Sequence, residues 1–537
     1  MREGRIAALL AAMRRWPKTT AVALGVVAAC GFPPLHIWPL TLLALAGFVA
    51  LLARASTWRR AFALGWVFGV GHFTLANNWI AQAFTFQDAM PHWLGWLAVP
   101  LLSLYLAVYP GLAALGGWAL GRKAGPAAFG VIFAACWIVA EWLRSWVFTG
   151  YAWDPLGLVL LGGWKTQGIA ALLPWLGTYA LSGLAVLLGV VVWVFVRERR
   201  WLLLGASCAL VTVAMVLPPA ALPGEGAVRF TLVQPFIPQD ELDDPTRFEE
   251  HFQRTAALTA RRETGLERIV LWPESGVPDY LEDGYPQRYY DSMTAAGDPA
   301  FARARIAQLV GDRSVLLTGA VNLDIGDTAR GRRAVSARNS VIALDGNSGE
   351  IVRQYAKAHL VPYGEYLALR WLLEPLGATR LVAGTIDFKP GPGPQTLSLG
   401  RFGTVGPQIC YEIVFSGQVI DRANRPDFIF NPSNDGWFGR FGPPQHLAQA
   451  RMRAIEEGLP VLRSTTTGIS AVIDARGIVR ASIGMEEADY IDGTIPPARP
   501  QTLFARFGNA LPLAWATLLL ALALGLPRLV ASRRSAG

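Results

Sequence analysis

Residues 166–196 read TQGIAALLPWLGTYALSGLAVLLGVVVWVFV and contain no acidic or basic side chain. A membrane-spanning helix needs about 20 consecutive apolar residues, so this stretch is long enough to cross a bilayer. Further apolar segments lie on both sides of it, at residues 19–35, 38–54, 60–80, 93–120, 126–148, 201–220 and 509–530. The sequence therefore predicts a polytopic α-helical membrane bundle with eight transmembrane helices.

The basic residues predict how these helices are oriented. Lys and Arg gather at the amino terminus, in the connections after the second, fourth and sixth segments, and in the carboxyl-terminal tail, whereas residues 31–37 and 77–92 carry none. Cytoplasmic loops of membrane proteins hold an excess of Lys and Arg. Both termini are therefore predicted to be cytoplasmic, and the large polar part before the last helix is predicted to face the outer side. No basic stripe interleaved with aromatic residues indicates nucleic-acid binding.

The polar part of the chain has the alternating pattern of an α/β domain. Apolar, strand-like runs are separated by helical stretches at residues 246–262 and 445–457. A segment containing Pro and Gly, residues 217–226, marks the exit from the seventh apolar segment. The expected organisation is a membrane bundle over residues 1–220 with seven helices, an α/β domain over residues 227–497, and the eighth helix at residues 509–530.

Three residues that could carry chemistry each follow a predicted strand. They are Glu274 after Val270–Pro273, Lys357 after Ile351–Ala356, and Cys410 after Val405–Ile409. Because catalytic groups gather at the carboxyl ends of strands in α/β sheets, separate sequence positions can converge in space. Taken alone, each residue type more often has a structural role, as a solvated acid, a solvated lysine or a small core cysteine.

Cysteine and histidine usage gives no indication of a metal or another cofactor. Of the four cysteines, Cys30, Cys136 and Cys208 lie in apolar segments, and Cys410 stands alone in the polar domain. Cys410 therefore has no local disulfide partner. The chain has no Cys-x-x-Cys pair, and its six histidines do not form a His-Glu-x-x-His motif. We expect no metal and no cofactor.

The local sequences around the three residues are more specific than the residues themselves. The segments Leu271–Ser275, Lys357–Glu365 and Ile409–Glu412 resemble the signatures of the nitrilase superfamily, and Asn431–Phe438 is similar to a fourth, strand-end pattern of that superfamily. The resemblance implies an αββα sandwich that carries a Glu–Lys–Cys triad.

The apolar segments around this domain restrict the resemblance to membrane-embedded members of the superfamily. Nearly the full chain, including Val233-Gln234 and Ile237-Pro238-Gln239, is similar to the apolipoprotein N-acyltransferases of bacterial envelopes, a membrane-embedded branch of the superfamily. The resemblance implies transfer of an acyl chain from a phospholipid to the α-amine of the amino-terminal diacylglyceryl-cysteine of an apolipoprotein, at the periplasmic face of the bacterial inner membrane. It also implies that Cys410 is the nucleophile, Glu274 the general base and Lys357 the cation beside the oxyanion. The supporting residues that it implies are Glu365, Tyr411 and Glu412.

In one place the sequence departs from this pattern. The family commonly has a tryptophan a few residues after the Ile-Pro-Gln motif, whereas Asp240–Asp244 contains no aromatic residue. The family's aromatic contact over the active site is therefore not expected from this segment.

A Trp-rich stretch on the predicted outer side suggests a lipid contact. We expect Arg144 to attract a phosphate and Trp153 to line the lipid path. An ordinary interfacial aromatic belt accounts equally well for these tryptophans.

Two other functions use the same features. A membrane-anchored hydrolase of carbon–nitrogen or ester bonds would need the same triad, and a non-catalytic lipid carrier would need only the membrane bundle. The preceding helices favour a lipid substrate over a small soluble one, and the three triad residues together favour an enzyme.

Overall fold

The computed structural model describes residues 15–86, 90–220, 224–260, 266–376, 380–381 and 386–535. Contacts within the chain divide it into two compact units. The first, here called the helical unit, contains residues 1–81, 93–219 and 507–537. The second, here called the sheet unit, contains residues 82–92 and 220–506.

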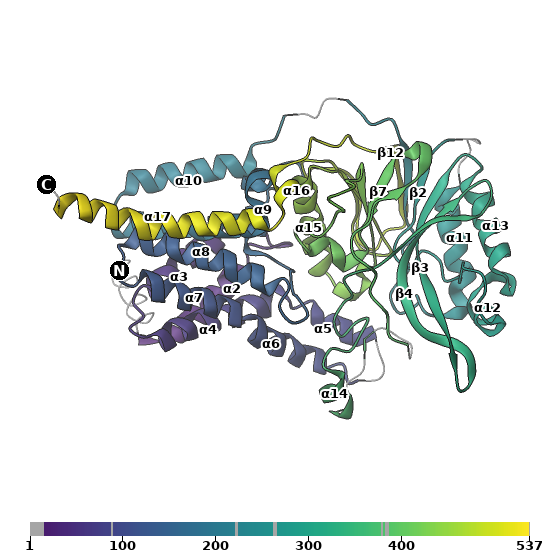
Figure 1. Ribbon diagram of the computed structural model, residues 1–537, viewed down its shortest axis with the longest axis horizontal. Helices are drawn as coiled ribbons and strands as arrows, with labels where there is room; N and C mark the ends of the chain where they lie inside the picture. Colours follow the sequence, from purple (N-terminus) through teal and green to yellow (C-terminus); the bar gives the residue numbers. More distant parts are fainter. Residues whose placement is uncertain are drawn as a thin grey trace. The chain divides into compact units, whose positions relative to one another are not determined.

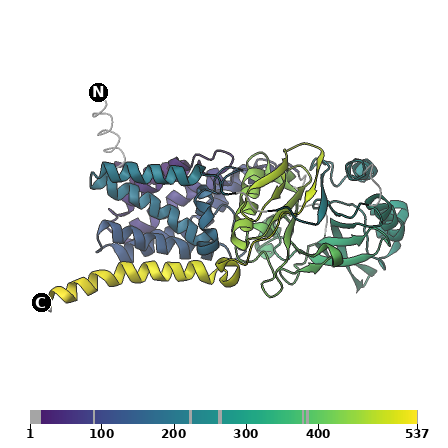
Figure 2. The same cartoon turned by 90° about the horizontal axis from the view of Figure 1, so that it is seen from above.

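Every predicted apolar segment forms helix over most of its length. The longer helices of the helical unit are α2 (Pro17–Ala29), α3 (Trp38–Leu52), α4 (Trp58–Ala76), α6 (Leu94–Leu106), α7 (Val108–Gly121), α8 (Pro126–Arg144), α9 (Leu173–Arg197), α10 (Trp201–Val216) and α17 (Ala510–Ser535). Helix α4 packs against α2 and α7, and α8 packs against α7, α9 and α17 (Figures 1 and 2).

Small residues allow close helix packing in this unit, as is common in membrane bundles. Gly25 of α2 faces the backbone of α4, where a Cβ atom at this position would lie 2.0 Å from the carbonyl oxygen of Phe68. Any side chain at residue 25 would therefore push α2 and α4 apart.

Three helices in the described part of the chain are long and apolar enough to cross a membrane. They cover Leu94–Gly121, in which α6 and α7 follow each other directly, Pro126–Arg144 and Ile169–Arg197. The apolar helices Pro17–Ala29, Trp38–Leu52, Trp201–Val216 and Ala510–Gly525 are shorter. At a rise of about 1.5 Å per residue, the first three fall short of a hydrocarbon core about 30 Å thick. The chain thus has membrane-spanning helices, and the number eight stays a prediction.

The sheet unit contains two six-stranded sheets. The strand order of the first is β12-β1-β2-β3-β4-β5, and that of the second is β11-β10-β9-β8-β7-β6. Strands β1 to β3 pair in parallel in the first sheet, as do β7 to β9 in the second. The first sheet is made of β1 (Arg229–Gln234), β2 (Ile269–Leu271), β3 (Val315–Thr328), β4 (Gly331–Asp345), β5 (Ile351–Ala356) and β12 (Asp489–Thr494). The second is made of β6 (Leu397–Ser398), β7 (Thr404–Pro407), β8 (Phe428–Ser433), β9 (Val461–Thr465), β10 (Ser470–Ile473) and β11 (Val479–Ile483).

Helices cover the outer faces of the two sheets, which gives the four layers of the expected αββα sandwich. Helices α11 (Phe248–Thr259) and α13 (Pro299–Val310) pack on the first sheet, and α15 (Gly442–Glu457) packs on the second (Figure 1). The two sheets meet directly, since the Ser464 hydroxyl on β9 donates to the carbonyl of Val233 on β1 at 2.7 Å.

Packing in the core beneath α11 fixes the position of the chain just before Glu274. Trp272 follows β2, is fully buried and packs edge-on against Phe252 of α11. Its indole N–H donates to the Thr259 hydroxyl at 2.9 Å, so the polar atom of this large side chain is satisfied inside the core. The position of residue 274, two residues later, is therefore set by packing.

Candidate active site

The structure brings Glu274, Lys357 and Cys410 together inside the sheet unit. Glu274 follows β2 and Lys357 follows β5 of the first sheet, whereas Cys410 follows β7 of the second. The three residues are 7%, 2% and 4% exposed. Gly319 of β3 makes room for Glu274, because a Cβ atom at residue 319 would lie 2.7 Å from the Cα of Glu274. The site thus lies between the two sheets, where water is largely excluded.

Lys357 is held as an ammonium by two carboxylates. Its Nζ lies 3.0 Å from Oε1 of Glu365 and 3.5 Å from Oε1 of Glu274. Burial lowers the pKa of Lys357, but the negative charges of Glu365 and Glu274 outweigh burial and raise it above its usual value. The lysine therefore supplies a fixed positive charge beside the cysteine.

A residue that sequence reasoning missed connects the two acids. The Asn339 side-chain amide donates to Oε1 of Glu274 at 2.7 Å and to Oε1 of Glu365 at 2.9 Å. Asn339 lies on β4 beside Lys357, whose backbone N–H donates to the Asn339 carbonyl at 2.8 Å. The second oxygen of Glu274 accepts from the backbone N–H of Asn434 at 2.8 Å. Both carboxylates are thus fixed by several donors each.

Cys410 has a backbone conformation that is uncommon for a non-glycine residue. Its φ angle is +49°, and it begins the 3₁₀ turn Cys410–Val414 directly after the strand. Such a conformation costs roughly 1–3 kcal/mol and persists only where the surroundings hold it. The turn directs the nucleophile candidate out of the strand.

Glu412 ties this turn to the Lys357 segment. Its Oε1 accepts from the Tyr355 hydroxyl and the Ala358 N–H, both at 2.7 Å, and its Oε2 accepts from the Ile409 N–H at 2.8 Å. Burial raises the pKa of Glu412 to about 7, although these donors lower it. Tyr411, the third predicted supporting residue, is buried and packs edge-on against Phe415.

The cysteine rests as a neutral thiol. Burial raises the pKa of Cys410 well above its usual range, and the Glu274 carboxylate raises it further, while Lys357 opposes both. The thiol therefore has to transfer its proton before it can attack a carbonyl carbon, because the thiolate is the nucleophilic form. A carboxylate at Glu274, held beside the same ammonium, has the chemistry of the required base.

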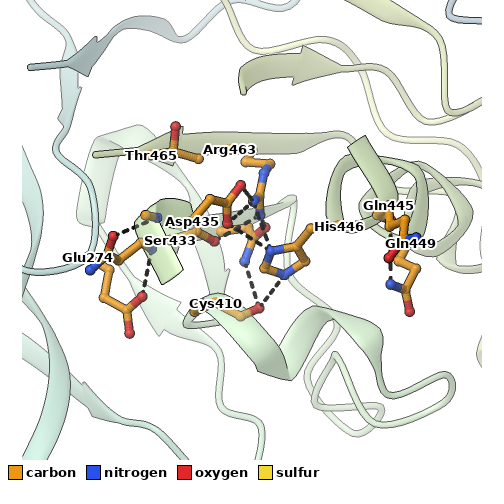
Figure 3. A network of polar contacts seen from close by, with 12 residues as sticks. Glu274, Cys410, Ser433, Asp435, Gln445, His446, Gln449, Arg463 and Thr465 are labelled. Atoms are coloured by element: carbon orange, nitrogen blue, oxygen red, sulfur yellow. Dashed lines mark hydrogen bonds and ion pairs between the residues drawn. The ribbon is translucent and has the colours of Figure 1, made fainter. Parts of the chain in front are cut away.

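A buried polar network on the other side of Cys410 was also missed by sequence reasoning. It contains Asp435, His446 and Arg463, none of which is appreciably exposed (Figure 3). The His446 Nε2 lies 3.0 Å from the Cys410 carbonyl oxygen. Its Nδ1 lies 2.9 Å from Asp435 and 3.0 Å from Arg463.

Known proteins match the chain over both units. The model for the apolipoprotein N-acyltransferase N-terminal domain matches residues 24–191, and that for carbon-nitrogen hydrolases matches residues 229–503. An apolipoprotein N-acyltransferase of Rhodopseudomonas palustris is 32% identical, with 91% of each chain covered. Those of Bradyrhizobium diazoefficiens and Caulobacter vibrioides are 32% and 34% identical, with 91% and 92% of each chain covered. The chain belongs to the apolipoprotein N-acyltransferase family.

The Ile-Pro-Gln motif of this family member contacts the site, although the segment after it lacks the aromatic residue. Gln239 of the motif is buried, and its Oε1 accepts from the Asn434 side-chain amide at 2.7 Å. The following residues form a turn, in which the Glu241 N–H donates to the Pro238 carbonyl. The motif therefore supports the residue whose backbone N–H holds Glu274.

One group of side chains near Cys410 has the composition of a metal site. Among the described residues, ligand atoms of Cys410, Asp435 and His446 lie within 4.8 Å of one another. The Arg463 guanidinium, however, bonds both oxygens of Asp435, at 2.7 and 2.6 Å, and approaches the imidazole as well. A cation already fills this position, so the residues present do not fit a divalent metal.

In the helical unit, the two predicted lipid contacts of this apolipoprotein N-acyltransferase family member contact each other. Arg144 Nη1 donates to the backbone carbonyl of Trp153 at 2.8 Å, and the guanidinium lies 5.1 Å from the ring centre of Phe73. Arg144 is 3% exposed and Trp153 is fully buried. Arg144 also lies 3.9 Å from Glu141. Their contact with lipid stays a prediction.

Proposed function

We propose that this protein transfers an acyl chain from a phospholipid to the α-amine of an apolipoprotein's amino-terminal diacylglyceryl-cysteine. The observation that carries the proposal is the buried group of Cys410, Glu274 and Lys357 in a chain that also has membrane-spanning helices. Membership of the apolipoprotein N-acyltransferase family supports the same donor and acceptor classes. The reaction has two half-reactions on one nucleophile, so its kinetics are ping-pong.

In the first half-reaction the thiol proton of Cys410 passes to Glu274, and the sulfur attacks the ester carbonyl carbon of the phospholipid. Negative charge develops on the carbonyl oxygen, where the Lys357 ammonium and the backbone N–H of Tyr411 stabilise it. One such donor is worth about 3–4 kcal/mol. The tetrahedral intermediate then expels the lysophospholipid alkoxide, which takes the proton from Glu274, and a thioester remains on Cys410.

In the second half-reaction the lipoprotein amine attacks the thioester carbonyl. Glu274 accepts a proton from the amine, and Lys357 again faces the oxyanion. Collapse of the intermediate forms the amide and releases the Cys410 thiolate, which recovers the proton from Glu274. Since thioesters also hydrolyse, the burial of all three residues serves the reaction by limiting access of water.

Glu365, Tyr411 and Glu412 have supporting roles in this proposal. Glu365 fixes the ammonium of Lys357, and Glu412 holds the turn that begins at Cys410. Tyr411 contributes its backbone N–H to the oxyanion.

Product analysis tests the acyl transfer. The purified chain is supplied with phospholipid and a diacylglyceryl-cysteine peptide, and the Cys410→Ala variant serves as the control. We expect N-acylated peptide and lysophospholipid in equal amounts from the parent and neither from the variant. Free fatty acid in place of acylated peptide would indicate a hydrolase, and lipid binding without any product would indicate a carrier.

We also propose that the helical unit delivers the donor lipid past Trp153 and Arg144. Because Arg144 is bonded to the backbone of Trp153, the Trp153→Ala variant removes the indole and leaves the guanidinium bond in place. This change should raise KM for phospholipid more than it lowers kcat. An unchanged KM would contradict the lipid contact and favour a purely structural role.

The membrane arrangement that we propose has eight spans, both termini in the cytoplasm and the sheet unit in the periplasm of a bacterial inner membrane. Reporter fusions test it. A reporter that is active only in the periplasm should be active after residue 226 and inactive at the carboxyl terminus. The reverse pattern would refute this topology.

A further inference from the structure

The backbone carbonyl of Cys410 has its own hydrogen-bond donor. The His446 imidazole approaches it at 3.0 Å, and the Asn431 side-chain amide lies farther away, at 3.5 Å. His446 lies on α15 and Asn431 on β8, so the contact joins the nucleophile turn to two other elements. The left-handed backbone of Cys410 is uncommon for a residue with a side chain, so contacts from other elements help to hold it.

The protonation of His446 follows from its partners. A carbonyl oxygen only accepts hydrogen bonds, so Nε2 must carry a hydrogen in order to bond to Cys410. Burial and the Arg463 guanidinium lower the pKa of His446, whereas Asp435, whose Oδ1 lies 2.9 Å from Nδ1, raises it. The ring is therefore a donor towards the backbone of Cys410 and is not placed to accept the thiol proton through Nε2.

Arg463 and Asp435 hold the His446 imidazole at Nδ1, the ring nitrogen that does not face Cys410. The Arg463 guanidinium forms two bonds to the Asp435 carboxylate and also bonds the Ser433 hydroxyl at 2.8 Å and the Asn431 side chain (Figure 3). Burial raises the pKa of Asp435, but the charge of Arg463 outweighs burial and lowers it. The pair thus stays charged. It forms a rigid frame in the middle of the second sheet, where Asn431 and Arg463 are register partners on β8 and β9.

We propose that His446, held by Asp435 and Arg463, is a positioning residue that orients the peptide bond between Cys410 and Tyr411. This peptide is planar and trans, so its C=O and N–H point in opposite directions. A bond that fixes the Cys410 carbonyl oxygen therefore also fixes the direction of the Tyr411 N–H. In the proposed acyl transfer, on which this inference rests, that N–H is the backbone donor to the oxyanion.

The geometry of an oxyanion donor is demanding. Donors act when they lie about 2.7–3.1 Å from the position of the developing oxyanion, and loss of one lowers the rate by roughly 10²–10³-fold. Rotation of a single peptide unit would move the Tyr411 N–H out of this range while the Cys410 side chain, Glu274 and Lys357 keep their own contacts. Loss of the His446 bond should therefore impair acyl transfer more than it impairs reactions of the thiol that form no oxyanion.

Two variants of similar volume separate this role from simple packing. His446→Leu removes the donor, whereas His446→Gln keeps an N–H group close to the position of Nε2. His251→Ala is the control, because His251 is also buried in the sheet unit but lies on α11, which covers the outer face of the first sheet. Each full-length protein is assayed for Cys410 acylation by phospholipid in a single turnover, and for alkylation of Cys410 by iodoacetamide.

We expect His446→Leu to lose roughly 10²-fold in acylation rate, the size expected for one oxyanion donor, while alkylation changes by less than about fivefold. His446→Gln should recover most of the lost rate, and His251→Ala should match the parent. Equal losses in acylation and alkylation, or a Gln variant no better than Leu, would overturn the positioning role. A parent chain that is not acylated would instead contradict the proposed function. A Leu variant as fast as an acylating parent would contradict only the inference.

Discussion

Replacing Lys357 with methionine removes a buried positive charge but keeps a side chain of similar length. The ammonium lies 3.0 Å from Glu365 and 3.5 Å from Glu274. At an effective dielectric constant of about 20, each contact corresponds to roughly 5 kcal/mol of attraction. Without it, the two buried carboxylates still share the Asn339 amide, but no cation offsets their mutual repulsion.

The variant therefore loses the cation at the oxyanion and weakens the base as well. The oxyanion contribution alone is about 3–4 kcal/mol, or roughly 10²–10³-fold in rate. Loss of an effective general base adds to this, so we expect thioester formation to fall by at least ~10³-fold. The assay is single-turnover acylation of Cys410, followed by intact mass.

A matched control uses the other lysine of the sheet unit. Lys389 is about half exposed and lies 3.8 Å from Asp324, away from the triad. The Lys389→Met variant should form the thioester at the parent rate. If Lys357→Met acylated within tenfold of the parent, Lys357 could not be the cation that stabilises the oxyanion, and the charge argument would be refuted.

Two further changes test other polar groups of the sheet unit. Asn339→Ala deletes the amide that bridges Glu274 and Glu365. Because a hydrogen bond to a charged group is worth about 1.5–3 kcal/mol, we expect single-turnover acylation to slow by roughly 10–100-fold. A parent-like rate would show that the bridge is dispensable. Burial raises the pKa of Glu457 to about 8, and neither of its buried carboxylate oxygens has a hydrogen-bond partner among the described residues. Because the folded-state pKa is raised, the stability from its bound proton is fully present below about pH 4.5 and is lost as the pH rises through 8, by up to about 5 kcal/mol. Glu457→Gln should therefore raise the melting temperature at pH 9 and change it little at pH 5, as measured by thermal unfolding in detergent, and the opposite order would contradict the assignment.

The helices could be predicted from the sequence because long apolar runs without charges have few alternatives in a membrane protein. Their ends could not. The apolar segment at residues 93–120 forms two helices, α6 and α7, which meet at Ala107 between Pro100 and Pro110. Proline removes a backbone donor and crowds the preceding turn, so hydropathy alone overstates how continuous such a segment is.

The convergence of Glu274, Lys357 and Cys410 could be predicted because each follows a strand and lies within a distinctive local sequence. The strands before them were located to within a few residues, as at β5 and β7. What the sequence did not indicate was that Cys410 follows a strand of one sheet, whereas Glu274 and Lys357 follow strands of the other. That arrangement depends on how the two sheets pack, which no local pattern encodes.

The supporting network was missed for a different reason. Asn339 lies inside the long strand β4, and His446 is a single histidine on a helix, so both have an ordinary structural interpretation. Arg463 did carry a usable signal. It follows Val461-Leu462 in the buried strand β9, and a charged residue is almost never fully buried unless it is paired. An arginine in such a run predicts a buried acidic partner, here Asp435.

The thioester on Cys410 is the central claim of the mechanism, and intact mass measures it most directly. The purified parent chain and its Cys410→Ala variant are incubated with a phospholipid of defined acyl length and then weighed. The account predicts a gain of one acyl group on the parent alone, which a diacylglyceryl-cysteine peptide then discharges. A parent chain that binds the phospholipid but gains no mass, or a Cys410→Ala variant that gains the same mass, would contradict it.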